Sequence, residues 1–263
     1  MAFYARSFIF DGIPSEVFGL IITSSDSGEG QWNASSDVEI KTEKLFRRPV
    51  PYFYGTTQTP VLEFEAQITT TSGELTAVDS SLIQKWLFGK STYKKLRIVQ
   101  PDMEDIYYNC FLTNPQINRV GNIIRGFTFN IVCDSPFAWK NPKSVTYTVS
   151  NRTYTLYNES DNNFYTYPKL VIDMDGTSNG SISIKNVTDN NNTFAMTGLP
   201  AQDVITVDCD LQIVTDSLNT PNLLNKLATP INFLRLLTGT NQLFILGNID
   251  YVKITYTPMK RVG

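Results

Sequence analysis

The chain has 263 residues, enough for two domains of ordinary size or one large β domain. Charged residues make up 18% and the formal net charge is -3, so the chain lacks the clustered Lys and Arg of a nucleic-acid-binding protein, and we expect no specific nucleic-acid partner. It has no histidine, which excludes Ser-His-Asp and Cys-His catalysis and His-ligated metals in their usual forms.

In the first part of the chain, strands and one helix are predicted from residue periodicity. Residues 62–68 alternate between apolar and polar side chains, which is typical of a β-strand with one buried face. Residues 79–88 instead carry apolar side chains at helical spacing, and they predict the one short helix. Asp79 or Ser80 is expected to cap its start, and Gly89 to end it in the left-handed conformation.

A domain boundary is predicted after the next strand. Residues 127–133 alternate again, and residues 134–143 follow with two prolines, which cannot pair within a central sheet. The chain holds 25 acidic and 22 basic residues; 15 acidic and 12 basic fall in residues 1–138, which leaves 10 of each for residues 139–263. We therefore expect two β domains with different surfaces, divided at these positions.

The second part of the chain is also predicted to be β-rich. Residues 145–149 and 153–157 are expected to form a hairpin that turns at residues 150–152. Residues 251–256 predict a further strand, and residues 222–228 a helical turn. The fold class expected from these patterns is mainly β with a single helix.

Cysteines and turn acids give no metal-site pattern. Cys110, Cys133 and Cys209 lie far apart in apolar runs, where cysteine usually behaves as a small hydrophobic residue. A calcium-binding loop beginning at Asp173 needs a glutamate at its twelfth position, which is Ile184 here. A β-turn is therefore the preferred interpretation of the Asp173 segment, and we expect neither a metal nor a cofactor.

Acidic pairs are the remaining candidates for catalysis. Glu63 and Glu65 face the same side of a strand, opposite its apolar face, and Glu104 and Asp105 form a second pair. A glycosidase needs two carboxylates facing each other across a cleft, and neither pair predicts that arrangement. Phosphate-binding glycine motifs are absent from the sequence as well. We therefore predict that the protein is not an enzyme.

Tyrosines crowd the beginning of the second part of the chain. Their rings suit either a protein interface or stacking on a sugar, and packing or an interface is the preferred interpretation. The five residues of this candidate carbohydrate or partner surface are Tyr147, Tyr154, Tyr157, Tyr165 and Tyr167.

The sequence also predicts where the protein is made. Residues 1–10 lack the basic start and long apolar run of a signal peptide, so we expect no signal peptide and synthesis in the cytoplasm. No run approaches the length of about 18 apolar residues that a membrane span needs, so no membrane insertion is expected.

Several segments, in the right order, resemble the siphophage distal tail protein family of long-tailed bacteriophages. The resemblance covers nearly the whole chain, and its strength comes from the combination of segments rather than from one motif. These segments are Phe8 to Ile13, Ser15 to Leu20, Gln84 to Lys90, Tyr93 to Pro101, Phe129 to Trp139, Tyr167 to Ile172, Phe233 to Asn241 and Val252 to Pro258.

The resemblance implies a fold and a place in the virion. Residues 1–138 are expected to form a β-sandwich or split barrel that assembles as a homohexameric ring, and residues 139–263 a galectin-like β-sandwich. The ring is expected at the tail tip of the virion, between the tail tube protein and the tail-tip spike or tail-associated lysin, with DNA passing through it. Receptor-binding proteins or host cell-wall saccharide are the further partners implied.

Three other functions stay open at this point. The chain could be a carbohydrate-binding module that recognises the host cell wall, in which case the tyrosines form its site. A wall-degrading enzyme is disfavoured by the absence of histidine and of a defined acid pair. A tail-tube subunit would polymerise into long tubes rather than stop at one ring.

Overall fold

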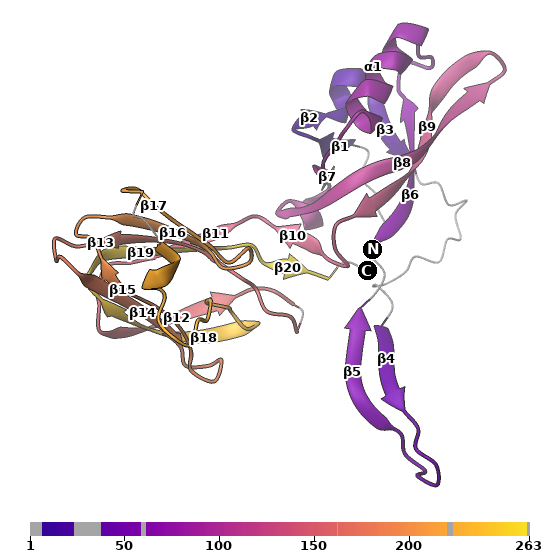
Figure 1. Ribbon diagram of the computed structural model, residues 1–263. Coiled ribbons are helices and arrows are strands. Elements are labelled where there is room, and N and C mark those ends of the chain that lie inside the picture. The colour runs from indigo at the N-terminus through magenta and orange to yellow at the C-terminus, as the bar shows by residue number, and fades with distance from the viewer. Residues whose placement is uncertain (1–6, 24–37, 59–61, 162, 220–222, 262–263) are drawn as a thin grey trace. The chain divides into compact units, whose positions relative to one another are not determined.

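The computed structural model describes residues 7–23, 38–58, 62–161, 163–219 and 223–261. The chain divides into two compact units, which we describe separately. Unit 1 comprises residues 1–139 and 260–263, and unit 2 comprises residues 140–259. Both are built mainly from β-strands (Figure 1).

Unit 1 holds the one α-helix of the described residues, α1 (Ala77–Phe88), and two short 3-10 helices, Ser15–Phe18 and Pro101–Met103. Its strands are β1 (Ser7–Phe10), β2 (Ile13–Pro14), β3 (Leu20–Thr23), β4 (Val38–Glu43), β5 (Tyr52–Gln58), β6 (Glu63–Thr70), β7 (Lys94–Val99), β8 (Ile106–Val120) and β9 (Ile123–Cys133). The short strand β10 (Ala138–Lys140) leads into unit 2 and pairs with β20 (Met259–Lys260).

One sheet dominates unit 1, with the strand order β2-β1-β7-β8-β9-β6-β3. The two apolar faces predicted from alternation lie on neighbouring strands, since Ile68 of β6 is opposite Phe127 of β9 and Ala66 is opposite Phe129. Their side chains, together with the inward side of α1, form a single core. Alternating sequence thus produces one buried sheet face that the helix covers.

Trp86 joins α1 to the N-terminal strand. Its indole Nε1 donates a hydrogen bond to the backbone oxygen of Phe10, at 3.1 Å. Its ring stacks on Phe18 at a centroid distance of 4.7 Å and on Phe8 at 5.8 Å. A large buried ring whose N–H finds an acceptor fixes the position of the helix on the sheet.

Both predicted ends of the helix need correction. The N-cap is Thr76, not Asp79 or Ser80: its side chain accepts from the backbone nitrogen of Asp79, whose carboxylate accepts in turn from that of Thr76. This capping box starts the helix two residues earlier than predicted. Gly89 follows the helix with φ -84°, outside the left-handed region. A Cβ there would lie 2.7 Å from the Lys85 oxygen, which explains the glycine.

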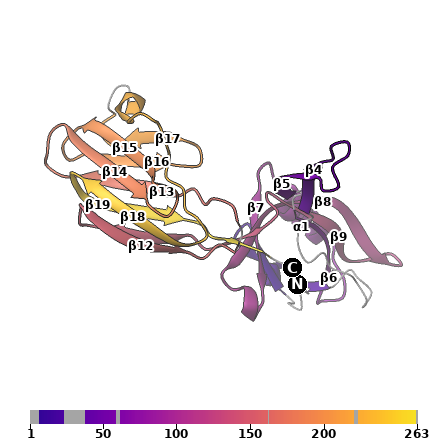
Figure 2. The ribbon, with the colours of Figure 1, turned by 90° about the horizontal axis from the view of Figure 1, so that it is seen from below.

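Unit 2 is a two-layered sandwich (Figure 1 and Figure 2). Its strands are β11 (Lys143–Tyr147), β12 (Arg152–Asn158), β13 (Lys169–Met174), β14 (Gly180–Asn186), β15 (Asn192–Leu199), β16 (Val204–Asp208), β17 (Ile213–Asp216), β18 (Gly239–Gly247) and β19 (Ile249–Tyr256). One sheet has the order β11-β19-β13-β16-β17 and the other β12-β18-β14-β15, and a 3-10 helix, Leu223–Lys226, precedes β18.

The hairpin predicted for residues 145–157 is wrong. The strand β11 pairs with β19 and β12 pairs with β18, so the two segments belong to opposite sheets. The turn at residues 150–152 therefore carries the chain from one layer to the other. Val145 and Leu156 both pack into the core of unit 2, but an inward face alone does not determine which strand is the neighbour.

Candidate functional site

The hairpin of β4 and β5, which we call the arm (residues 38–58), pairs with no other described strand. Its apolar side chains are unusually exposed: Phe46 at its turn is 90% exposed, and Phe53 and Tyr54 of β5 are each 66% exposed. Ile40 of β4 and Val50 of the turn are more than 60% exposed as well. Such a surface is typical of a segment that a partner covers.

The turn of the arm is basic as well as apolar. Lys44, Arg47 and Arg48 lie within it, and residues 44–51 contain no acidic residue. The Arg48 guanidinium lies 3.5 Å from the centroid of the Tyr52 ring, close enough for a cation–π contact. The turn therefore presents apolar rings and positive charge together.

The five tyrosines predicted as one surface do not form one. Tyr147 and Tyr154 face the interior of the sandwich, with ring centroids 4.2 Å apart, and Tyr147 is only 7% exposed. Tyr157 points the other way from β12 and is 63% exposed. Tyr165 and Tyr167 lie beyond β12, on either side of the buried Thr166.

Tyr165 and Tyr167 belong to a smaller group, the tyrosine–arginine cluster, which also contains Asp189 and Arg235. The Arg235 guanidinium lies 4.0 Å from the Tyr165 ring centroid, and the Tyr165 and Tyr167 rings are 6.5 Å apart. Arg235 donates to both carboxylate oxygens of Asp189, at 2.6 and 3.2 Å. The Asp189 side chain is 3% exposed, so a buried carboxylate holds the Arg235 guanidinium in place. The Tyr165 and Tyr167 rings of the cluster stay accessible.

Sequence reasoning missed Asp189 and Arg235, because they lie 46 positions apart and neither stands in a recognisable motif. The signal available was the lone arginine of an apolar run, Phe233 to Leu237. An arginine there needs a counter-ion, and a buried carboxylate that pairs with two guanidinium N–H groups supplies it. That carboxylate raises the pKa of Arg235 above its ordinary value.

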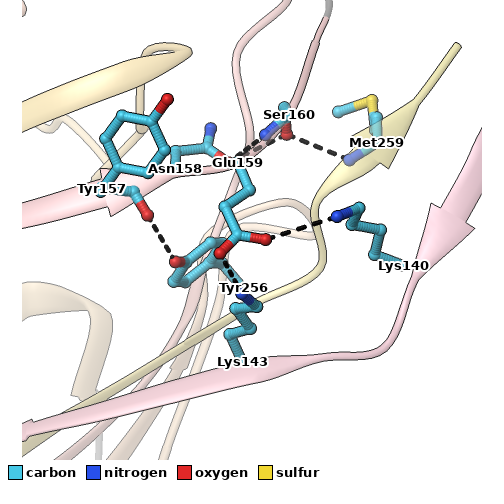
Figure 3. Close-up of polar contacts among 8 residues, drawn as sticks. All are labelled: Lys140, Lys143, Tyr157, Asn158, Glu159, Ser160, Tyr256 and Met259. Atoms are coloured by element: carbon cyan, nitrogen blue, oxygen red, sulfur yellow. Dashed lines mark hydrogen bonds and ion pairs between the residues drawn. The ribbon is translucent and has the colours of Figure 1, made fainter. Parts of the chain in front are cut away.

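A second polar group lies where the chain enters and leaves unit 2 (Figure 3). The Glu159 carboxylate pairs with Lys143 and, at 3.5 Å, with Lys140. The hydroxyl of Ser160 accepts from the backbone nitrogen of Met259 at 3.0 Å. Lys140 in turn donates its backbone N–H to the oxygen of Pro258, at 2.9 Å. These contacts clamp the first and last residues of unit 2 together.

Glu63 and Asp175 each accept a hydrogen bond from another group of the protein. Glu63 accepts a hydrogen bond from the Asn130 side chain at 3.0 Å, on the exposed face of β6. Asp175 accepts from the backbone nitrogen of Thr177 at 2.8 Å, as a turn aspartate does. Within the described parts of the chain, no group of three or more Cys, Asp or Glu side chains is arranged to hold a metal.

Two family matches together cover almost the whole sequence. The family described as phage tail protein N-terminal domain matches residues 3–135, and the one described as phage tail C-terminal domain matches residues 137–256. This chain belongs to the phage tail protein family. No curated protein sequence matches it.

Solved structures support the same conclusion for the fold of this phage tail protein. The crystal structure of the Dit (gp 19.1) protein of phage SPP1, described as a paradigm of the hub adsorption apparatus in phages infecting Gram-positive hosts, has a TM-score of 0.69 at 12% identity. The match covers 96% of this chain and 98% of that one. A chain of the activated, calcium-containing baseplate of phage P2 has a TM-score of 0.57 at 10% identity, covering 98% and 99%.

The predicted resemblance is thus confirmed at the level of family and fold, as is the mainly β architecture with one helix. The protein is a structural component of a phage tail, which places it in the virion, and it is not an enzyme. None of the described helices is long and apolar enough to cross a membrane.

Proposed function

We propose that this phage tail protein forms a homohexameric ring at the distal end of a siphophage tail. The ring joins the tail tube protein to the tail-tip spike, lets DNA pass and carries receptor-binding proteins. Support comes from the family and from a fold shared with the SPP1 hub protein over 96% of this chain. The observation that most directly supports self-assembly is the exposed arm.

The arm needs a partner for physical reasons. An isolated two-stranded hairpin is only marginally stable in water, because few of its side chains are buried. In this arm, both β5 and the turn expose large rings, including the 90% exposed Phe46. Covering them removes apolar surface from water and stabilises the arm at about 25 cal/mol per Å².

A neighbouring copy of the same chain is the partner we assign to the arm. The turn carries Lys44, Arg47 and Arg48, while the exposed face of β6 carries Glu63 and Glu65. A basic turn on one copy and an acidic strand face on the next suit a head-to-tail contact. Contacts of that kind generate closed rings when the rotation between copies closes.

Imaging and mass measurement test the proposal directly. Negative-stain images and mass photometry over a range of concentrations should show six-fold rings of the full-length protein. A Phe46→Ser/Phe53→Ser variant should stay monomeric, since it removes the exposed rings of the arm. The matched control is Val78→Ser, which removes a 68% exposed apolar side chain from α1 and should still form rings. Rings in the arm variant, or strict monomers of the unmodified protein even with tail tubes added, would contradict the proposal.

DNA passage fits the charge of the proposed ring domain. Residues 1–138 hold 15 acidic and 12 basic residues, and an acidic lumen repels DNA rather than retaining it. Neutralising the acidic residues that line the lumen should therefore slow DNA ejection from phage particles. Unchanged ejection kinetics would count against this part of the proposal.

A second candidate function is saccharide recognition by unit 2, and the tyrosine–arginine cluster favours it. The Tyr165 and Tyr167 rings are 38% and 42% exposed, and aromatic faces stack on the apolar faces of sugars. The Arg235 guanidinium beside them, whose side chain is 33% exposed, supplies N–H donors for hydroxyl groups.

Binding of purified host cell-wall polysaccharide tests this candidate. A Tyr165→Ala/Tyr167→Ala variant should lose saturable binding measured by calorimetry. Tyr157→Ala is the control, because it removes an exposed tyrosine that lies outside the cluster. If the unmodified protein shows no saturable binding, this candidate function is wrong.

A further inference from the structure

Two of the three free cysteines lie directly opposite each other in the sheet of unit 1. Cys110 of β8 is the register partner of Cys133 of β9. Both side chains are fully buried and belong to the same core. Because directly opposite residues of an antiparallel pair project to the same face, the two thiols are neighbours.

The hydrogen bonds around Cys110 and Cys133 show which kind of position the two residues occupy in the antiparallel ladder. The backbone nitrogen of Cys133 donates at 2.9 Å to the backbone oxygen of Leu62, the residue before β6 on the other side of β9, so it does not point toward Cys110. One position further on, Asp134 donates its N–H to the oxygen of Asn109, also at 2.9 Å. Cys110 and Cys133 therefore occupy a non-hydrogen-bonded position of the antiparallel ladder.

This position has the spacing that a disulfide needs. Cα atoms of a non-hydrogen-bonded pair lie about 4.5 Å apart, and disulfides span Cα separations of about 4.4 to 6.8 Å. The side chains approach each other more closely here than at hydrogen-bonded positions. Closing the bond therefore requires side-chain rotation and only a small movement of the strands.

We propose that Cys110 and Cys133 are a redox-active pair that forms a reversible disulfide and staples β8 to β9. The oxidant is of the small-disulfide class, for which oxidised glutathione is the probe. One cysteine loses its proton, and its thiolate attacks the oxidant to give a mixed disulfide and one released thiol. The other cysteine, also deprotonated, displaces the second thiol. Two cysteine thiols are oxidised and one oxidant disulfide is reduced to two thiols.

Burial makes this reaction slow and selective. It raises the pKa of Cys110 to about 12 and that of Cys133 as well, so both are protonated thiols at neutral pH. Thiolate is the reacting species, and oxidation therefore requires transient opening of the strands. The pair stays reduced in a reducing compartment and closes over longer exposure to oxidant. Cys209 belongs to the core of unit 2 and has no thiol opposite it in its own core, so it serves as an internal control.

Mass spectrometry of the full-length protein tests the proposal. The protein is incubated with oxidised glutathione at pH 8.5, in buffer and in urea below the unfolding transition, and then labelled with N-ethylmaleimide after denaturation. Reduced protein should take three labels and oxidised protein one, on Cys209. Peptide mapping should find Cys110 linked to Cys133, and dithiothreitol should restore three labels.

Two variants test which cysteines form the linkage. Cys209→Ser should still form the linkage and retain no label after oxidation. Cys133→Ala should form none, and its Cys110 should at most carry glutathione. Exhaustive oxidation that leaves three labels on the unmodified protein, or that ends in glutathione adducts on Cys110 and Cys133 instead of a linkage between them, would overturn the proposal.

Discussion

Thr76 fixes the start of α1 through a single side chain. It accepts from the backbone nitrogen of Asp79 at 3.1 Å, which satisfies one of the free N–H groups of the first turn. Thr76→Ala should therefore lower the free energy of unfolding by about 1 kcal/mol. Urea denaturation measures the change, and Ser81→Ala on the exposed side of the same helix is the control. An equal loss in both variants would show that the cap contributes nothing specific.

Glu159 makes part of the stability of unit 2 depend on pH. The hydrogen bond from Lys143 is the main cause that holds the pKa of Glu159 below its ordinary value, and burial partly opposes it. A carboxyl group whose pKa falls on folding stabilises the protein above its unfolded value of about 4.3. That contribution is lost as the pH falls through the lower, folded pKa.

We therefore expect Glu159→Gln to destabilise the protein at pH 7 and to make little difference in strong acid. The effect should be at most about 1 kcal/mol, because the Glu159 side chain is 34% exposed and solvent screens the pair. Thermal melts of Glu159→Gln, Lys143→Met and the double variant measure it. If the two single losses add fully in the double variant, the two residues do not interact.

The buried Asn241 has a structural role that sequence analysis did not predict. Asn241 accepts from the backbone nitrogen of Leu237 and from the side chain of Asn186, and it donates to the Leu237 oxygen. It shapes the turn before β18 while being fully buried. In the sequence, Asn241 looks like an ordinary turn residue, because its bonds to Leu237 are local and its partner Asn186 lies 55 positions away on β14.

At the scale of elements, limited proteolysis tests whether the arm is covered. Trypsin cleaves after Lys44 and Arg47, and both residues lie in the exposed turn. In the proposed ring a neighbouring copy covers the arm, so cleavage should be at least about tenfold slower than in the monomer, as expected when opening must precede proteolysis. The monomeric Phe46→Ser/Phe53→Ser variant should be cleaved rapidly at every concentration, and protection of that variant would contradict the assignment.

Strand alternation predicted inward faces well and neighbours poorly. Residues 62–68 and 127–133 were expected to be strands with one buried face, and they pair with each other in register. Residues 145–149 and 153–157 have the same pattern but lie in opposite sheets. Period-two patterning reports which side is buried, while pairing depends on turn geometry and on distant strands that the local sequence does not contain.

The candidate surface was also predicted only in part. The sequence placed five tyrosines in one region, but alternation along β11 and β12 turns Tyr147 and Tyr154 into the core and Tyr157 outward. The tyrosine–arginine cluster forms because Thr166 pairs with Leu236, which brings Arg235 to Tyr165. That contact joins segments about 70 positions apart, and no local sequence pattern predicts it.

At the scale of the whole molecule, the two units have different surfaces for different tasks. Unit 1 carries the arm and the acidic excess, whereas unit 2 carries the tyrosine–arginine cluster. The hydrogen bonds from Met259 to Ser160 and from Lys140 to Pro258 hold the two ends of unit 2 together. This division suits the proposed function, in which one unit assembles and the other meets further partners.

Ring assembly by head-to-tail contact makes a charge-exchange prediction. Glu63→Lys/Glu65→Lys should abolish rings, because it places like charges opposite the basic turn of the neighbouring arm. Lys44→Glu/Arg47→Glu/Arg48→Glu should abolish them for the same reason. Mass photometry at low and high salt measures the ring fraction of each variant alone and of their mixture.

The decisive observation is the combination of both sets of changes in one chain. It restores opposite charges across every interface, so rings should return to a level near that of the unmodified protein. High salt should weaken the rings of the unmodified protein and partly rescue each singly reversed variant, since screening acts on attraction and repulsion alike. If the combined variant stays monomeric although it is folded, the arm meets its neighbour elsewhere than at the exposed face of β6, and the charge match between these two surfaces has no part in closing the ring.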